Sequence, residues 1–234
     1  NKDSYKECSK GTYVRGLVRI EKPVKEAFAC TTALGLYNFF LNGKKVGKDE
    51  MTPGWTSYRR HLLYQTYDVT EYLTQGENVA GAMLAAGWYK GVMGLTKARN
   101  NYGDQTGFAM QLLVRYEDGS EEIICTDDNW KGADSPIIFS EIYNGETYDA
   151  SLEIPKWSEQ LETPAEFHDV VEVSFDCSVL RAQSGARVTE MDELPCKRVF
   201  QTPKGETVLD FGQNFAGFVR FSGMLRHGQM LKIS

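Results

Sequence analysis

Short apolar segments separated by turn residues recur along the chain, and their pattern predicts β-strands. Residues 34–41 are rich in aromatic and apolar side chains and stop at Asn42-Gly43, a dipeptide that tolerates the positive φ angles of a tight hairpin turn. Residues 62–67 alternate like a half-buried strand, and residues 79–84 are again apolar. Between them, Asp68 stands three residues before Glu71, which predicts a short helical turn. The pattern indicates a β-sandwich rather than a helical protein.

The strand pattern continues on both sides of this stretch. Residues 13–20 and 27–32 are expected to pair beside it, because their β-branched and aromatic content favours strands. The clearest hairpin lies within residues 108–125, where alternating apolar positions reach a turn and then return. Further short strands are predicted at the regular spacing of a sandwich, over residues 127–130, 136–139 and 141–149.

A change in composition near Glu166 predicts a domain boundary. Residues 154–166 contain two prolines and three glutamates with little apolar periodicity, which is typical of a linker or a surface crossing. We therefore expect one sandwich over residues 1–165 and a second over 166–234. The second unit has short strands at residues 170–175, 186–189, 207–211 and 217–221. These make only part of a sandwich, so the unit is expected to continue beyond the given residues.

Composition excludes several classes of partner. The 26 basic and 32 acidic residues are well mixed and leave a net charge of -6, so there is no basic stripe for nucleic acid. No apolar run approaches the roughly 18 residues of a membrane span, and the first residues are too polar for a signal peptide. The five cysteines contain no Cys-x-x-Cys pair, which argues against a zinc or redox motif. They are Cys8, Cys30, Cys125, Cys177 and Cys196.

No catalytic motif is found. His61, His168 and His227 have neither a nucleophile elbow nor a reactive cysteine nearby. Zinc-binding helices, phosphate-binding loops and dinucleotide fingerprints are also missing from the sequence. Two carboxylates could hydrolyse a glycosidic bond, but spacing cannot select two that face each other among 32 acidic residues. The sequence therefore indicates no active site.

Aromatic and polar loop residues are better candidates for a binding site. Residues 92–105 show no periodicity and are interpreted as a long loop, a class of segment that often carries function. Aromatic rings at strand ends and in loops can stack on a sugar. The candidate carbohydrate-binding residues are Trp55, Trp88, Asn100, Asn101 and Tyr102. Core packing is the alternative interpretation of the aromatic residues, above all of Trp88 and Tyr67.

Calcium is the candidate cofactor. Asp49, Asn101 and Asp104 supply the hard oxygen ligands that calcium takes, with Asn100 nearby, although their spacing matches no EF-hand loop. Capping of backbone groups in turns is the alternative role for such residues.

Several motifs together resemble a known family. Residues 41–47 (Leu-Asn-Gly-Lys-Lys-Val-Gly), 53–58 (Pro-Gly-Trp-Thr-Ser-Tyr), 87–91 (Gly-Trp-Tyr-Lys-Gly) and 144–150 (Asn-Gly-Glu-Thr-Tyr-Asp-Ala) resemble the N-terminal sandwich of bacterial α-L-rhamnosidases of glycoside hydrolase family 78. Residues 210–220 resemble the start of the next β-domain in these enzymes. The resemblance covers nearly the whole chain and implies an all-β fold with a jelly-roll-like sandwich followed by the beginning of a second one.

The resemblance also implies a function. The parent protein would be an inverting hydrolase that removes terminal L-rhamnose from plant polysaccharides or glycosides. It would act in the bacterial periplasm or as a secreted protein. In this family the catalytic carboxylates come from a later (α/α)₆ barrel, so no residue of this chain is assigned a catalytic role. Some members bind L-rhamnose through calcium, and by analogy the loops that hold Asp49 and residues 100–104 would form that site. Relatives often carry two acidic residues where this chain has Lys48-Asp49.

Three hypotheses remain open at this point. The chain is the non-catalytic N-terminal part of an α-L-rhamnosidase, which supports the barrel and holds rhamnosyl substrate. Alternatively, it is a stand-alone carbohydrate-binding module, or a structural accessory domain that binds no sugar. An exposed Trp55 or Trp88 would favour sugar binding, whereas burial of both would favour a scaffold.

Overall fold

The computed structural model describes residues 9–94, 97–223, 226 and 228–233, and it divides into two compact units. The first unit comprises Asn1–Glu190 and the second Met191–Ser234. Cys8 and His227 lie outside the described residues. None of the helices in the described residues has the length and apolar character needed to cross a membrane.

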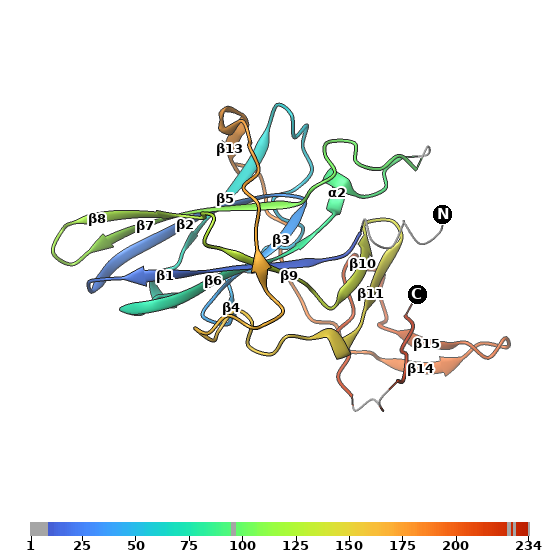
Figure 1. Cartoon of the computed structure of the whole chain (residues 1–234). Helices are drawn as coiled ribbons and strands as arrows, with labels where there is room; N and C mark the ends of the chain where they lie inside the picture. Colours follow the sequence, from blue (N-terminus) through green and yellow to red (C-terminus); the bar gives the residue numbers. More distant parts are fainter. Residues whose placement is uncertain (1–8, 95–96, 224–225, 227, 234) are drawn as a thin grey trace. The chain divides into compact units, whose positions relative to one another are not determined.

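Two β-sheets form the layers of the first unit (Figure 1). The first sheet has six strands in the order β12 (His168–Asp169), β9 (Lys131–Asp134), β1 (Thr12–Ile20), β6 (Gly76–Ala85), β3 (Leu36–Leu41) and β4 (Lys44–Lys45). The second sheet has five strands in the order β13 (Leu180–Ala182), β5 (Leu62–Asp68), β2 (Val24–Leu34), β7 (Gly107–Tyr116) and β8 (Glu121–Cys125). All neighbouring strands run antiparallel except β13 and β5, which are parallel. The β-sandwich expected from the sequence is confirmed.

Smaller elements connect these strands. A separate hairpin consists of β10 (Ile137–Glu141) and β11 (Gly145–Tyr148). The helical elements are short: η1 (Thr70–Tyr72), α2 (Gly87–Lys90), η2 (Ala150–Leu152) and η3 (Cys177–Val179). The predicted helical turn is η1; its N-cap is Val69, and Asp68 just before it accepts a 3.0 Å hydrogen bond from the Thr70 amide. Residues 127–130, which were predicted as a strand, form a turn in which Asp127 accepts a hydrogen bond from the Asn129 amide.

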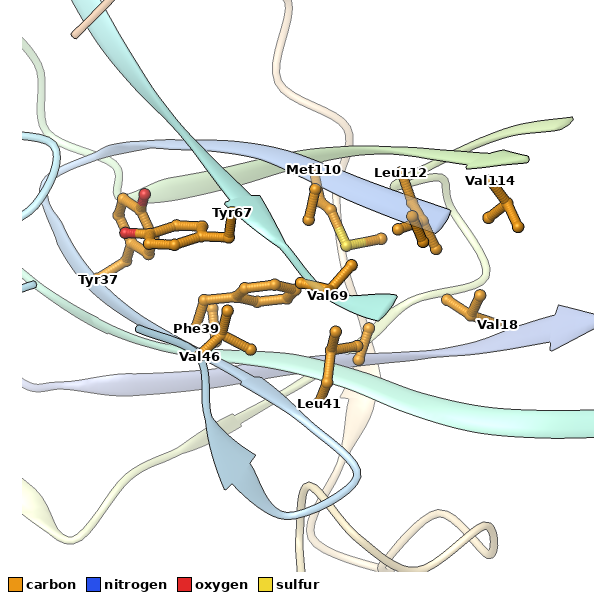
Figure 2. Close-up of a cluster of buried hydrophobic side chains, with 14 of the residues drawn as sticks. Val18, Tyr37, Phe39, Leu41, Val46, Tyr67, Val69, Met110, Leu112 and Val114 are labelled. Carbon is orange, nitrogen blue, oxygen red and sulfur yellow. The ribbon is translucent and has the colours of Figure 1, made fainter. Parts of the chain in front are cut away.

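The main core fills the space between the two sheets. In Figure 2, Met110, Leu112 and Val114 of β7 point toward Phe39 and Leu41 of β3. Alternation along each strand places these side chains on the inner face, while their neighbours point outward. The tight turn after β3 supports this register, because Asn42 and Gly43 adopt the positive φ angles of 48° and 80° that the dipeptide predicts. The sandwich is therefore held by inward-facing apolar residues of both sheets.

The outer face of the six-stranded sheet is covered by the segment that the sequence predicted as a linker or surface crossing. Trp157 stacks on Tyr13 with ring centroids 4.1 Å apart and meets Phe40 edge-on. Arg15 is buried beneath the same segment, and its guanidinium donates hydrogen bonds to the carbonyl oxygens of residues 160, 161 and 162. The segment is a surface crossing that packs on the sheet.

The two units divide between Glu190 and Met191, later in the chain than the boundary expected near Glu166. Beyond the expected boundary, β12 pairs with β9 and β13 pairs with β5, so these residues complete the two sheets of the first unit. The following stretch reaches the segment after β4, where Asp49 forms a bridge with Thr189. Edge pairing, which local composition does not reveal, therefore keeps residues 166–190 with the first unit.

The second unit contains one hairpin among its described residues, made of β14 (Arg198–Gln201) and β15 (Thr207–Asp210). Strand β15 agrees with the strand predicted over residues 207–211. The strand predicted over 217–221 is not formed in the structure, and neither is the one over 170–175 in the first unit. Most apolar side chains of residues 217–221 are exposed, so no packed face holds this segment as a strand.

Candidate functional site: an aromatic cluster at the end of β6

The candidate site is built where β6 ends and α2 begins. The sharp change of direction depends on Gly87, which has a φ of +52° and lies against Leu36. A Cβ atom at this position would come within 2.5 Å of the Leu36 side chain, so a larger residue would not fit without a shift. The turn places Trp88 and Tyr89 beside the segment that leads into β5.

Five aromatic residues from three segments meet here, and we call them the aromatic cluster: Trp55, Tyr58, Trp88, Tyr89 and Tyr102. Tyr58 is the buried centre, with ring centroids 5.3 Å from Tyr89 and 4.8 Å from Tyr102, both in edge-on geometry. Its hydroxyl donates a 2.9 Å hydrogen bond to the carbonyl oxygen of Gly54. The cluster continues the small apolar core formed with Leu34 and Leu62.

One side of the aromatic cluster faces solvent. Trp55 is 54% exposed, and its ring lies nearly parallel to that of Trp88, with centroids 6.1 Å apart and planes at 10°. Trp88 itself is partly buried. The indole Nε1 of Trp55 donates a 3.3 Å hydrogen bond to the Tyr102 hydroxyl. These contacts hold an exposed indole in a fixed orientation, which is the arrangement that stacks on an apolar sugar face.

The long loop that the sequence predicted is joined to α2 by backbone hydrogen bonds. The Asn100 amide donates a 2.9 Å hydrogen bond to the Lys90 carbonyl oxygen, and Asn100 has a left-handed φ of 55°. The Tyr102 amide donates to the Tyr89 carbonyl oxygen at 3.3 Å. Leu95 and Thr96 of this loop lie outside the described residues. Of the residues predicted for carbohydrate binding, Trp55 thus contacts Trp88 and Tyr102, while Asn100 and Asn101 precede Tyr102 in the loop.

Asn101 lies in the same loop and contacts Arg59. Its side-chain amide donates to the Ala98 carbonyl oxygen at 3.2 Å, and its own carbonyl oxygen accepts a 3.3 Å hydrogen bond from Arg59 Nη2. Both Asn101 and Tyr102 are partly buried, whereas Asn100 and Asp104 are exposed. Polar groups with different accessibility therefore border the exposed indole.

A buried ion pair anchors the loop immediately before these residues. The Arg99 guanidinium contacts the Glu141 carboxylate of β10, and the side chains are 15% and 0% exposed. Ser9 donates a 2.5 Å hydrogen bond to Glu141 Oε1 and accepts one of 3.0 Å from Arg99 Nη1. Asn144 donates to the other carboxylate oxygen at 2.7 Å. The loop is thereby tied to the β10–β11 hairpin and to the start of β1.

Two tyrosine hydroxyls of the cluster have raised pKa values. Burial raises the pKa of Tyr58, and the neighbouring Tyr102 and Tyr89 add to the rise. Burial also raises the pKa of Tyr89, with a contribution from Asp104, while the positive charge of Arg59 opposes it. Neutral tyrosines can both donate and accept hydrogen bonds to sugar hydroxyls.

The candidate calcium ligands are not held as one set. The Asp49 carboxylate is buried and forms a 2.9 Å ion pair with Arg187, while Asn101 and Asp104 belong to the loop beside the aromatic cluster. Within the described ranges, no group of three or more His, Cys, Asp or Glu side chains could hold a metal ion. Because calcium takes six to eight oxygen ligands and Asp49 is already paired with a cation, the residues present do not fit a calcium site that includes Asp49.

Two groups beside the site were missed by the sequence interpretation: the cation Arg59 and the Arg99–Glu141 pair. Arg59 follows the buried Tyr58 and belongs to no sequence motif. Glu141 is 42 positions from Arg99 in the chain, so local spacing could not predict their ion pair. The described histidines are exposed: His61 lies in the turn before β5, and His168 lies in β12. The described cysteines are Cys30, Cys125, Cys177 and Cys196, and all are free thiols.

Comparison with known proteins connects this arrangement to one enzyme class. A family model described as the α-L-rhamnosidase N-terminal domain matches residues 22–192. An α-L-rhamnosidase of Streptomyces avermitilis is 38% identical over 225 residues, which cover 90% of this chain and 21% of that protein. The curated relatives that match are 31 to 38% identical, and the chain spans 21 to 24% of their length.

Solved structures agree with the sequence relatives. The native α-L-rhamnosidase of Aspergillus terreus matches with a TM-score of 0.83 and 39% identity, over 88% of this chain and 24% of that one. The Streptomyces avermitilis α-L-rhamnosidase complexed with L-rhamnose matches with a TM-score of 0.82 and 38% identity, over 88% of this chain and 20% of that one.

Proposed function

The chain belongs to the α-L-rhamnosidase N-terminal domain family, and from this premise we propose that it is the non-catalytic N-terminal portion of an α-L-rhamnosidase. The longer polypeptide would hydrolyse terminal L-rhamnose from polysaccharides or glycosides. Its catalytic carboxylates would come from an (α/α)₆ barrel in another part of that polypeptide, and these β-sandwiches would support the barrel. The 21 to 24% coverage of relatives supports this division of roles, because most of their length lies in other segments.

Rhamnosyl binding at the aromatic cluster is the specific role that we propose for the first unit. The observation that carries it is the exposed indole of Trp55, which lies parallel to Trp88 and is hydrogen-bonded to Tyr102. A deoxysugar presents an apolar face and a methyl group that match an indole, while Asn100 and Asn101 supply polar groups at the border. The related Streptomyces avermitilis enzyme was crystallised with L-rhamnose.

A purely structural role is the second candidate, and one observation favours it. Tyr58 is buried, and Tyr89 and Tyr102 pack edge-on against it. Part of the aromatic cluster therefore stabilises the turn before β5 whether or not a sugar binds. The two roles differ in what they require of Trp55, because a scaffold gains little from an indole that is more than half exposed.

Isothermal titration of the chain with L-rhamnose distinguishes these roles. We expect saturable binding by the native chain and about tenfold weaker binding by Trp55→Ala, because one stacking face is lost. Phe218→Ala is the matched control, since Phe218 is similarly exposed but belongs to the second unit. No heat with millimolar sugar, or equal binding by Trp55→Ala, would leave the domain as a scaffold.

The role of calcium is tested with the same titrations. Titrations with calcium and with a chelator test whether calcium assists rhamnose binding through loop oxygens of Asn101 and Asp104. Because Asp49 is paired with Arg187, we expect Asp49→Asn to change stability rather than any effect of calcium.

We also propose a periplasmic or secreted location, where polysaccharide substrates occur. Cell fractionation that recovers the parent protein only in the cytoplasm would contradict it.

A further inference from the structure

Two segments that carry the aromatic cluster are rich in basic residues, although the chain as a whole is acidic. Residues 55–61 and 87–105 together contain five Lys and Arg residues but a single acidic residue, Asp104, whereas the whole chain has 26 basic and 32 acidic residues. The five are Arg59, Arg60, Lys90, Lys97 and Arg99. Arg99 is compensated by the buried Glu141. The other four outnumber Asp104 within these two segments, while Asp176 follows Phe175 in a third segment that packs on the same core.

Arg59 contacts one of the candidate binding residues directly. Its Nη2 donates to the Asn101 carbonyl oxygen at 3.3 Å, which holds the exposed guanidinium beside the loop. Arg99, Arg115 and Arg187 all form ion pairs with carboxylates. Among the residues that the structure describes, no carboxylate lies within 4.0 Å of Arg59 to form such a pair. A positioned guanidinium that has no carboxylate partner can form an ion pair with an anionic group of a ligand.

We infer that the site at the aromatic cluster selects an anionic glycan, in which a sugar next to the terminal rhamnose carries a carboxylate or a sulfate that binds Arg59. The planar guanidinium presents parallel N–H groups that match both anions in bidentate geometry. A net charge of -6 repels polyanions at long range, so local positive charge is needed to bind an acidic polysaccharide. This inference rests on the proposed rhamnosyl-binding function and adds the chemistry of the neighbouring sugar.

Titration calorimetry at low salt with matched disaccharides tests the inference. The probes are a rhamnosyl-glucuronic acid disaccharide, the neutral rhamnosyl-glucose disaccharide, and its sulfated form. We expect at least one anionic probe to bind about fivefold to tenfold more tightly than the neutral one. The identity of the preferred probe separates a uronate from a sulfate ligand. Added salt should reduce the preference, because screening weakens an exposed ion pair.

Variants assign the preference to Arg59. Arg59→Gln should remove most of it while leaving the affinity for the neutral disaccharide within about twofold, and Arg59→Lys should restore it only in part. Arg19→Gln makes the same charge change on β1. Arg19 lies opposite Glu77 at the start of β6, away from the cluster at its other end, so this variant should keep the preference. Equal binding of all three probes, or a preference that Arg59→Gln does not alter, would overturn the inference while rhamnose binding stands. Failure of every probe to bind would overturn the proposed function, and the inference with it.

Discussion

Replacement of Arg99 by methionine tests whether its ion pair with Glu141 anchors the loop. Methionine keeps an unbranched side chain of similar length but removes the guanidinium that contacts Glu141. The Glu141 side chain is fully buried, so its carboxylate would keep only the hydrogen bonds from Ser9 and Asn144. A buried charge without its partner is strongly destabilising.

The size of the effect follows from this burial. Removing one partner of a buried ion pair costs about 3 to 5 kcal/mol, and we expect Arg99→Met to lie near the lower end because two neutral donors remain. Glu141→Gln should cost less than Arg99→Met, since a neutral amide can still accept hydrogen bonds from Ser9 and Arg99. The double variant Arg99→Met/Glu141→Gln should therefore be more stable than Arg99→Met alone.

Urea unfolding followed by tryptophan fluorescence measures these free energies. Arg19→Met is the matched control in the same unit, because Arg19 forms a 2.7 Å pair with Glu21 in which both side chains are more than half exposed. Such surface pairs contribute less than about 1 kcal/mol. If Arg99→Met cost no more than Arg19→Met, or if the double variant were the least stable of the set, the buried pair would not anchor the loop.

Two further changes test the packing and the electrostatics of the first unit. Gly16→Ala would place a Cβ atom 2.3 Å from the Trp130 indole, so we expect a loss of about 1 to 3 kcal/mol in thermal unfolding; Gly185→Ala, which meets nothing within 4 Å, should be neutral, and equal Tm values for the two variants would contradict the packing. Burial raises the pKa of Tyr37 to about 12, although hydrogen bonds with Thr31 and others oppose the rise. Because the folded pKa lies above the ordinary value near 10, the stabilisation from the protonated hydroxyl is complete below pH 10 and is lost as pH rises toward 12. The unfolding free energy of the native chain should fall by about 2 kcal/mol more than that of Tyr37→Phe across this range, and parallel pH profiles would show that this tyrosine does not titrate as the structure requires.

Local patterns were sufficient to predict most of the sandwich. Strand alternation and the Asn42-Gly43 turn placed β3, and the alternating positions between residues 108 and 125 placed β7 and β8. These signals are local because each strand buries one face and each tight turn needs particular φ angles. The extent of the first unit was not predictable in this way, since β12 and β13 are only two and three residues long and depend on partners far away in the chain.

The candidate site could also be predicted only in part from the sequence. Trp88 lies in α2, and Asn100, Asn101 and Tyr102 lie in the loop that is hydrogen-bonded to α2. Trp55 reaches both segments, because its ring lies parallel to that of Trp88. Asp49 was grouped with Asn101 and Asp104 by its chemistry and by analogy with the family. The structure pairs it with Arg187, 138 positions later in the chain. Spacing reveals which oxygen atoms a segment offers, but it does not reveal which cation already occupies them.

A crystal structure of residues 1–234 with L-rhamnose would test the central claim most directly. The account predicts a sugar ring stacked on the exposed indole of Trp55, with polar contacts to Asn100 or Asn101 of the adjoining loop. Rhamnose bound elsewhere on the sandwich, with the aromatic cluster left unoccupied, would contradict the account.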